Sequence, residues 1–305
     1  MNYKILNNLP PSHKWKTISL GGQLLKGIVW DQNDINQDDQ TILYKKWASV
    51  HFDSDWYEIA AGPVSNSEET ARDIAILKSF FGKKLNTKTN LIDVNCGISR
   101  HLIKLAEEKI FGVGMEGAAL LRKMGQEKAK KEKLPIEIVS TSRYFQNKYR
   151  RSADIVTSLF NSMGYTFNMN DDIHRLQWMI NLLKPRGYFL LDIRAEEYQK
   201  IHFSTPQITL EEIYLPTDSK KTPITIRTQK YWEDGILAAE ERVTVETKSK
   251  TIVQNTTYGW RTYSLTELEF ILKKVGMQLL ENKLDYYSSP KNVGERIFLL
   301  SQKID

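Results

Sequence analysis

Two acids and a glycine stand where a nucleotide-binding βαβ unit would need them. Asp93 lies in an apolar run, Gly97 follows that run, and Glu116 ends a second apolar run after a helical pattern. A glycine at the end of a buried strand lets backbone N–H groups approach a ligand, and an acid beside it can accept both hydroxyls of a ribose. The pattern predicts a cofactor that carries a nucleoside, with an ordinary crossover that binds no ligand as the alternative.

The glycine spacing argues against a dinucleotide. The dinucleotide fingerprint requires glycines at positions 95, 97 and 100, where this chain has Asn95, Gly97 and Arg100. The segment Asp93–Ser99 instead resembles the first motif of the class I S-adenosylmethionine-dependent methyltransferases, Asp-x-Gly-Cys-Gly-x-Gly. Asn95 and Ser99 take the place of two of its glycines.

Other segments resemble one bacterial branch of that superfamily, whose members act on small molecules. The branch continues its first motif with Arg-His, as Arg100 and His101 do here, and has Phe-x-Ser-x-Gly-Tyr after its fourth strand, where this chain runs from Phe160 to Tyr165. Its third strand ends in Gly-Asp-Met-Arg, and the aspartate accepts a hydrogen bond from the adenine amino group. Thr141 replaces that aspartate here.

The resemblance implies S-adenosylmethionine as the cofactor and methyl transfer to an O, N or C nucleophile of a small molecule. The residues that it places at the cofactor are Asp93, Asn95, Cys96, Gly97, Ser99, Glu116, Gly117, Thr141, Ser142, Phe160, Asn161 and Ser162. Displacement from a sulfonium depends mainly on holding the nucleophile and the methyl group in line, so a general base is optional. Tyr165 and His101 are the candidate catalytic residues, although His101 could instead pack behind the loop. The expected substrate contacts are Trp56, Tyr57, Tyr165, Arg261 and Tyr263.

Departures from the family pattern at Asn95, Ser99, Thr141 and Arg186 leave a second hypothesis open. The fold could serve a non-methylating reaction of the same cofactor, such as cleavage or cyclisation, or act as a non-catalytic partner that binds a ligand. Ser99 is the most informative departure, because it adds a side chain where the methionine end of the cofactor normally approaches the backbone.

A net charge of +6 and a pI near 9.1 would permit a nucleic-acid partner. The densest basic run, 122–133, contains Glu127 and Glu132 and no aromatic residue that could stack on a base, which favours a solvated helix face. The segment after the fourth strand also lacks the Asp/Asn-Pro-Pro-Tyr-like motif of enzymes that methylate a flipped base. RNA or DNA methylation is therefore the weakest hypothesis.

The composition is that of a globular chain, with 41% hydrophobic and 26% charged residues among 305. No apolar run approaches the length of a membrane span, and the first residues lack an apolar signal segment, so we expect a cytoplasmic protein, monomeric or homodimeric. Cys96 is the only cysteine, which excludes an internal disulfide. No metal site is predicted.

The elements that must position these residues predict an α/β fold. Strands and helices alternate from 91 to 193, and a helix capped by Ser264 precedes two strands, 277–286 and 296–302, whose connection contains no helix and so requires an antiparallel pair. This arrangement resembles the Rossmann-like seven-stranded sheet of class I methyltransferases, which ends in an antiparallel hairpin.

The remaining segments are assigned more coarsely. We predict an N-terminal extension or lid at 1–50, with a short helix over 41–50, and a methyltransferase-like domain at 51–305. Ser65 and Glu68 form a capping-box pattern that starts the helix before the first strand.

Residues 195–262 interrupt the βα alternation. Their alternating pattern predicts an antiparallel meander that would form a roof over the substrate or a dimer surface. Tyr258 and Trp260 should share one strand face, and Arg261 and Tyr263 the opposite one. We expect the Arg261 face to meet the substrate, which would favour an anionic small molecule over an apolar one.

Overall fold

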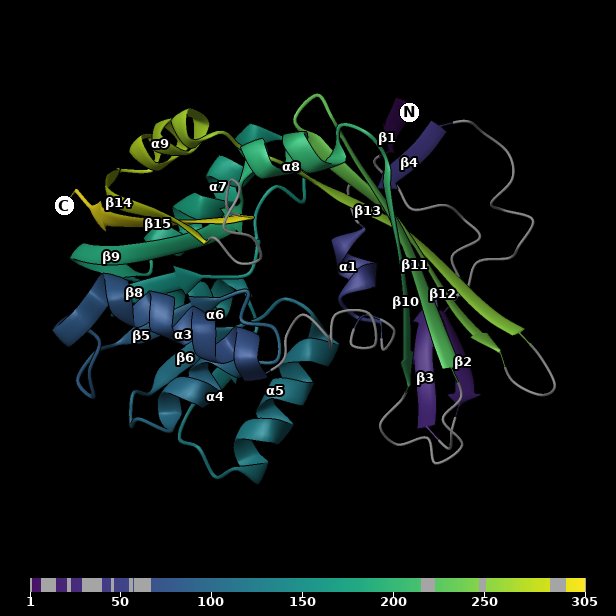
Figure 1. Ribbon diagram of the computed structural model, residues 1–305. Coiled ribbons are helices and arrows are strands. Elements are labelled where there is room, and N and C mark those ends of the chain that lie inside the picture. Colours follow the sequence, from purple (N-terminus) through teal and green to yellow (C-terminus); the bar gives the residue numbers. More distant parts are fainter. Residues whose placement is uncertain are drawn as a thin grey trace. The chain divides into compact units, whose positions relative to one another are not determined.

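The computed structural model of the chain describes residues 2–6, 15–20, 23–28, 40–44, 47–54, 57, 67–214, 223–246, 251–285 and 295–304 (Figure 1). Its contacts divide the chain into two compact units. The first comprises residues 1–64, 165–167 and 199–261, and the second comprises 65–164, 168–198 and 262–305. The contacts thus group the N-terminal segment with the inserted strands, and the predicted domain limits remain a prediction.

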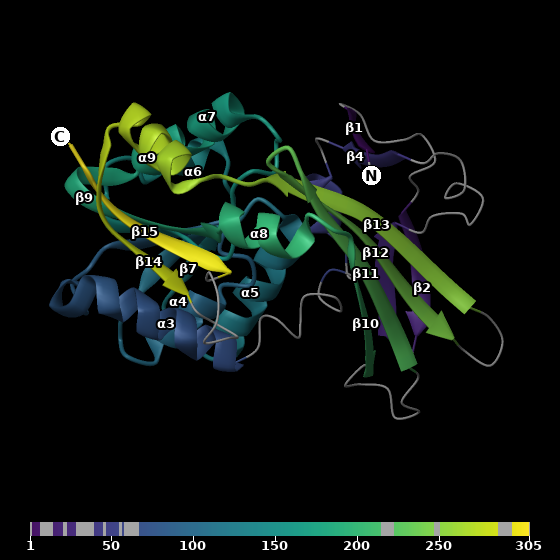
Figure 2. The ribbon, with the colours of Figure 1, turned by 45° about the horizontal axis from the view of Figure 1, so that its top comes forward.

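A seven-stranded sheet forms the centre of the second unit. Its strands lie in the order β14-β15-β9-β8-β5-β6-β7, with bounds β5 (Leu91–Val94), β6 (Gly112–Met115), β7 (Glu137–Val139), β8 (Ala153–Ser158), β9 (Leu183–Arg194), β14 (Met277–Asp285) and β15 (Arg296–Lys303). The pairs among β5 to β9 are parallel, and β15 runs antiparallel to both β9 and β14, between which it lies in Figure 2. This confirms the predicted Rossmann-like sheet and its antiparallel C-terminal hairpin.

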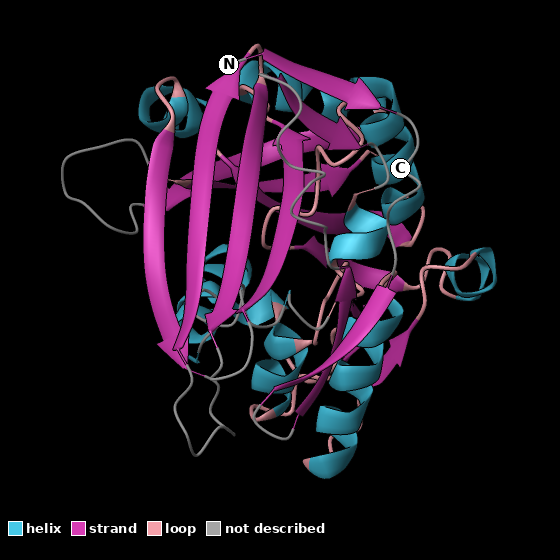
Figure 3. Cartoon of the chain, turned by 90° about the vertical axis from the view of Figure 1, so that its right-hand side faces the viewer, coloured by secondary structure: helices cyan, strands magenta, loops and turns pink. Residues whose placement is uncertain are grey.

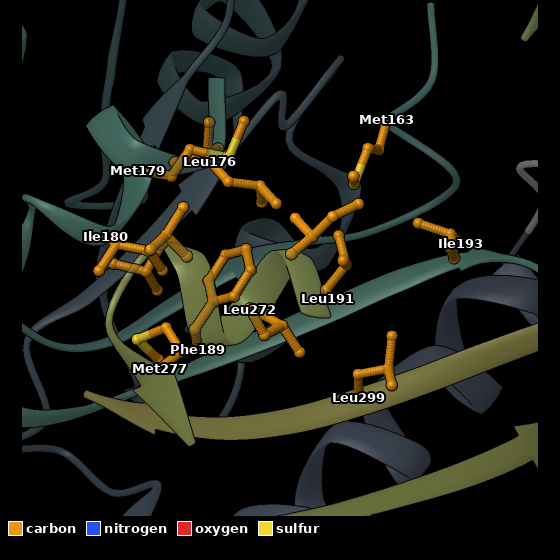
Figure 4. Packing of buried hydrophobic residues seen from close by; sticks show 14 of the residues in the cluster. Met163, Leu176, Met179, Ile180, Phe189, Leu191, Ile193, Leu272, Met277 and Leu299 are labelled. Atoms are coloured by element: carbon orange, nitrogen blue, oxygen red, sulfur yellow. The ribbon is translucent and has the colours of Figure 1, made fainter. Parts of the chain in front are cut away.

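Helices cover both faces of this sheet because successive residues of each buried strand point to opposite sides. Leu91 packs with α3 (Ser67–Phe81) and α4 (Arg100–Ala106), whereas its neighbour Ile92 packs with α7 (Met169–Ile180) and α9 (Leu265–Lys274). The remaining helices of the unit are α5 (Ala119–Lys131), α6 (Arg143–Lys148) and the 3-10 turn η3 (Gly82–Lys84). Figure 4 shows the second of these interfaces, where Leu176 and Leu272 meet Phe189 and Leu191 of β9.

The helix ends follow local capping rules. Ser264 and Glu267 form the predicted capping box at the start of α9, and Asn168 caps α7 by accepting from the N–H groups of Asn170 and Asp171. The predicted box at Ser65 lies outside the described residues. These caps satisfy N–H groups that have no partner within the helix.

The two edge strands of the sheet are interrupted or short. β7 contains only three residues, and the pairing of β14 with β15 shifts register between Leu279 and Glu281. Charged groups line both edges: Glu137 of β7 pairs with Lys148, and Lys283 of β14 pairs with Glu281.

The first unit contains a four-stranded antiparallel sheet in the order β10-β11-β12-β13, whose long strands are seen in Figure 3. The elements are β10 (Gln207–Tyr214), β11 (Pro223–Glu233), β12 (Ile236–Glu246) and β13 (Thr251–Arg261), preceded by α8 (Glu196–Phe203). A two-residue turn joins β11 to β12, with φ of 50° at Asp234 and 75° at Gly235. The predicted meander is therefore confirmed.

The N-terminal segment contains more strand than predicted. β1 (Asn2–Leu6) pairs in parallel with β4 (Gln40–Tyr44), and β2 (Trp15–Leu20) pairs with β3 (Gln23–Ile28). The helix predicted over 41–50 is wrong for residues 41–44, which belong to β4, and among the described residues of this range the helix begins at Ala48 (α1, Ala48–His51). Residues 41–44 join a partner strand more than thirty positions away, which no local pattern reveals. Within the described residues, no helix combines the length and apolarity needed to cross a membrane.

Candidate functional site

The direction of the chain through the sheet reverses beside β5. From β5 the chain continues through β6 to β7 on one side and then returns to β8 and β9 on the other. The carboxyl ends of β5 and β8 therefore lie at the topological switch point, which is where open α/β sheets bind ligands. The loops that begin at Asn95, Glu116, Ser140 and Leu159 all leave the carboxyl ends of these strands.

The loop after β5 keeps a glycine-like backbone although two glycines of the family motif are replaced. Asn95, Gly97 and Ser99 have φ of 56°, 56° and 61°. Asparagine tolerates this left-handed conformation, whereas serine adopts it at a cost of about 1–2 kcal/mol. A Cβ built on Gly97 would meet no atom within 4 Å, so the backbone there remains open to a ligand.

The side chain of Ser99 points beneath the loop. It is fully buried, and its hydroxyl donates to the Cys96 sulfur at 3.3 Å. Burial raises the pKa of the Cys96 thiol well above its usual value, so the sulfur is an uncharged packing group. The replacement of glycine by Ser99 therefore adds no atom to the exposed side of the loop.

We predict that Gly114→Ala will lower the free energy of unfolding by about 1–3 kcal/mol, as overpacking of a tight core does. A Cβ at Gly114 would lie 2.7 Å from the Cys96 sulfur and 3.2 Å from the Ser99 hydroxyl oxygen. Urea unfolding measures the loss. Adding Cys96→Ala removes the nearest atom, so the double variant should lose less than the sum of the two single losses. Additive losses would show that this contact is not the cause.

Glu116 is held by the backbone on both sides. Its Oε2 accepts from the N–H of Gly97 and its Oε1 from the N–H of Ala118, each at 2.7 Å. Burial raises the pKa of this carboxyl against the opposing effect of these hydrogen bonds. Each carboxylate oxygen retains a lone pair that can accept from a further donor, such as a ribose hydroxyl.

Asp93 and His101 lie behind the first loop. Asp93 Oδ1 accepts from the Thr157 hydroxyl at 2.7 Å, and its Oδ2 lies 3.8 Å from His101 Nδ1. The other ring nitrogen, Nε2, lies 3.0 Å from Asp73 Oδ2. Burial lowers the pKa of His101, but the hydrogen bond to Asp73 and the nearby Asp93 carboxylate outweigh it, so the net shift is upward. A buried imidazole between two carboxylates favours the role of packing behind the loop over that of a base.

The loops after β6 and β7 meet at Gly117 and Thr141. A Cβ built on Gly117 would lie 3.3 Å from the Thr141 hydroxyl oxygen, so these two positions are neighbours. The Thr141 carbonyl accepts from Gln146 of α6, while Ser142 is exposed. Thr141 is thus held in place at the site although it lacks the charge of the family's aspartate.

The loop after β8 is held in an uncommon conformation. Phe160 and Asn161 have φ of 62° and 55°, a combination that costs about 1–3 kcal/mol per residue and persists only where neighbours enforce it. Phe160 N–H donates to Asp192 Oδ2 at 2.6 Å, and Asn161 Oδ1 accepts from Arg194 N–H at 2.9 Å. The Ser162 hydroxyl donates to the Leu159 carbonyl, so its proton is not available to a ligand. Met163 anchors the loop in the core (Figure 4).

A buried cluster of charged and polar side chains joins these loops to α3. We call it the Asp73 network; its members are Glu69, Thr70, Asp73, Arg100, His101, Asp192 and Arg296. The sequence analysis missed it. The sequence does contain one signal for it. Asp73 lies four residues before Leu77 and eight before Phe81, so a charged residue occupies the apolar face of the predicted helix.

The expected substrate contacts have different placements. Tyr57 and Tyr165 belong to an aromatic cluster of the first unit, with ring centroids 4.9 Å and 5.6 Å from that of Phe52. Arg261 ends β13 in the same unit. Trp56 lies outside the described residues.

Tyr263 is not placed at a substrate surface. It is 1% exposed, and its hydroxyl donates to the buried Asp172 at 2.5 Å. The prediction that it shares a strand face with Arg261 is wrong, because β13 ends at Arg261 and Tyr263 forms an isolated bridge with Ala195. Tyr258 and Trp260 do share a face, since their rings stack at 6.2 Å.

Unsatisfied polar atoms remain near the first loop. Asp93 Oδ2 and Asn95 Nδ2 are buried and have no hydrogen-bond partner among the described residues. Such atoms are uncommon in folded proteins and are available to a ligand or to a water molecule. A ligand with both a donor and an acceptor, such as an amino-acid moiety, fits them, and the paired oxygens of Glu116 fit a ribose. No cluster of His, Cys, Asp and Glu suited to a metal ion occurs in the described part of the chain.

Comparisons with known proteins agree on the fold. Among solved structures, the chain is similar to an S-adenosylmethionine-dependent methyltransferase from Clostridium acetobutylicum, with 16% identity and a TM-score of 0.63 over 82% of this chain and 99% of that one. It is also similar to CalS10, an amino pentose methyltransferase from Micromonospora echinaspora, with 14% identity and a TM-score of 0.62 over 82% and 97% of the chains. The sugar N-methyltransferase KedS8 from Streptoalloteichus gives 14% identity and a TM-score of 0.63 over 82% and 93%.

No protein-family model and no curated protein sequence matches the chain. At these identities the likeness concerns the fold, which is that of S-adenosylmethionine-dependent methyltransferases.

Proposed function

We propose that this protein binds S-adenosylmethionine and transfers a methyl group to an O, N or C nucleophile of a small molecule. The observation that carries the proposal is the arrangement at the switch point of the sheet. An open backbone at Gly97, unsatisfied atoms on Asp93 and Asn95, and a carboxylate at Glu116 lie at the end of β5 and on the loops after β5 and β6. The matching fold of several methyltransferases supports it.

The proposed roles follow the loops. Asp93, Asn95 and the backbone of Cys96, Gly97 and Ser99 would hold the methionine end, and Glu116 would accept from the ribose. The adenine would lie against the remaining contacts, Gly117, Thr141, Ser142, Phe160, Asn161 and Ser162. When bound, the cofactor supplies a methyl group on a sulfonium centre. The protein's contribution would be to hold the nucleophile in line with it and to exclude water.

We propose no general-base role for His101, because its ring nitrogens face Asp73 and Asp93. Tyr165 remains the proposed catalytic side chain, and Tyr57 and Arg261 remain proposed substrate contacts. The names of two similar proteins, an amino pentose methyltransferase and a sugar N-methyltransferase, support a small hydroxylated or amino substrate.

The departures from the family motif do not favour the alternative, non-methylating function. Asn95 and Ser99 keep the left-handed backbone of the glycines that they replace, and the Ser99 side chain is buried beneath the loop. Arg186, with φ of 59°, lies in β9 between Leu183 and Tyr188, which pair with Ala153 and Ile155 of β8, and so lies at the end of the strands opposite the site.

Isothermal titration calorimetry with S-adenosylmethionine and S-adenosylhomocysteine tests the proposal. We expect both to bind with micromolar dissociation constants and one site per chain. A nucleoside without the ribose hydroxyls, 2′,3′-dideoxyadenosine, serves as the control and should not bind. Absence of heat with both cofactor forms would refute the proposed function.

A further inference from the structure

We propose that Asp73, a residue of α3 that no ligand would touch, is a positioning residue for both cofactor loops. The inference rests on the proposed function, since the loops concerned are those after β5 and β8. Asp73 contacts two guanidinium groups and one imidazole: Arg100 at 2.7 Å, Arg296 at 2.8 Å and His101 at 3.0 Å.

One arm of the network runs from Asp73 through His101 to the first loop. The imidazole lies between Asp73 and Asp93, and its second nitrogen is 3.8 Å from Asp93 Oδ2, which has no hydrogen-bond partner among the described residues. Asp93 is the last residue but one of β5, directly before the open loop. A shift of the imidazole would therefore move the carboxylate that is proposed to meet the methionine end.

The other arm runs through Arg296 to the loop after β8. Arg296 Nε donates to Asp192 Oδ1 at 3.0 Å and its Nη2 donates to Oδ2, the same oxygen that accepts from Phe160 N–H. The guanidinium groups of Arg100 and Arg296 lie 4.9 Å and 5.4 Å from the centre of the Phe160 ring. Two cations close to one ring, together with a bonded amide, can hold phenylalanine in its left-handed conformation.

The charges around Asp73 explain why its carboxylate is the centre of the network. Burial opposes its ionisation, but hydrogen bonding to His101 and the charges of Arg296 and Arg100 outweigh burial and hold its pKa below the usual value. Loss of this charge would leave two guanidinium groups and an imidazole competing for Glu69 and Asp192. The network therefore has one carboxylate through which both arms are fixed.

The test compares Asp73→Asn, His101→Gln and Tyr263→Phe by titration with S-adenosylhomocysteine between about pH 5.5 and 9. Asp73→Asn should bind the product about tenfold more weakly than the parent. Tyr263→Phe removes a buried hydrogen bond elsewhere in the same unit and is the control for a merely structural loss; its affinity should equal that of the parent.

The pH dependence separates positioning from stability. The charged groups facing His101 are Asp73 from α3, Asp93 from β5 and Arg100 from its own helix. Without the Asp73 charge the imidazolium loses its proton at lower pH, so the midpoint of the affinity change should move downward in Asp73→Asn. It should be unmoved in Tyr263→Phe. His101→Gln should lack it and keep only the decline in affinity that protonation of Glu116 causes, and this variant also serves if Asp73→Asn does not fold.

Failure of the parent to bind the product would refute the proposed function and this inference with it. If the parent binds the product and a folded Asp73→Asn variant has the same affinity and the same pH midpoint as the parent, the inference is overturned but the proposed function is not. If Asp73→Asn does not fold, the inference would be overturned by a His101→Gln variant that binds the product with the affinity and the pH dependence of the parent.

Discussion

Replacing Glu116 by glutamine is expected to weaken binding of S-adenosylhomocysteine by about 10- to 100-fold, since a hydrogen bond to a charged group contributes about 1.5–3 kcal/mol. The carboxylate accepts from Gly97 N–H with one oxygen and from Ala118 N–H with the other. A glutamine would turn an NH₂ donor toward one of these N–H donors. The loop that carries Gly97 would lose its anchor, and the ribose would lose an acceptor.

The raised pKa of Glu116 also predicts how the affinity for the product changes with pH. Burial raises the pKa of Glu116, and only the ionised form offers four acceptor sites. Affinity for the product should therefore decline as the pH falls through this raised pKa, at higher pH than for an exposed glutamate, and Glu116→Gln should lack that decline. Glu132→Gln, on the exposed end of the α5 segment, is the matched control and should bind as the parent does. A Glu116→Gln protein with affinity within about twofold of the parent would contradict the assigned role.

Replacing Arg296 by methionine should lower the free energy of unfolding by about 3–5 kcal/mol, the loss expected when one partner of a buried ionic group is removed. Arg296 donates to Glu69, Asp73 and Asp192, and it is 5% exposed. Methionine fills a similar volume but leaves three buried carboxylates with fewer cationic partners. The loss is measured by urea unfolding followed by circular dichroism.

Lys283→Met is the control for this change. Lys283 lies on the neighbouring strand β14. Its side chain is more than a third exposed, and its ammonium group pairs with Glu281. An exposed pair contributes little, so this variant should stay within about 0.5 kcal/mol of the parent. Arg296→Lys, which keeps the charge but not the planar fork, should lie between the two. A loss below about 1 kcal/mol for Arg296→Met would show that the carboxylates find other partners.

The sequence predicted the sheet well because its signals are local. Buried parallel strands appear as short apolar runs, and the helix start at Ser264 is encoded within four residues. The antiparallel pairing of β14 and β15 followed from a connection without a helix. The pairing of β1 with β4 escaped prediction because its partners are distant in the chain and neither strand carries a mark of the other.

The site was predicted in its loops but not in its supports. The conformations of Asn95 and Ser99 could not be read from residue type, since both replace glycines of the family motif. The Asp73 network could not be found either, because its contacts join residues 27 to 227 positions apart and each charge alone resembles a surface group. Tyr263 was misread because the end of β13, rather than the alternation of residues, decides where it lies.

The edges of the seven-stranded sheet have a consequence for association between copies of the chain. An exposed strand with a long row of free N–H and C=O groups can pair with a strand of another molecule and begin aggregation. β7 offers only three residues for such pairing, and the register shift between Leu279 and Glu281 bends the outer strand β14 away from a regular ladder. Lys148 beside β7 and Lys283 on β14 also place charged groups at these edges, and such groups disfavour pairing with the same strand of another copy. Growth of this sheet by addition of strands from other molecules is therefore opposed at both of its ends.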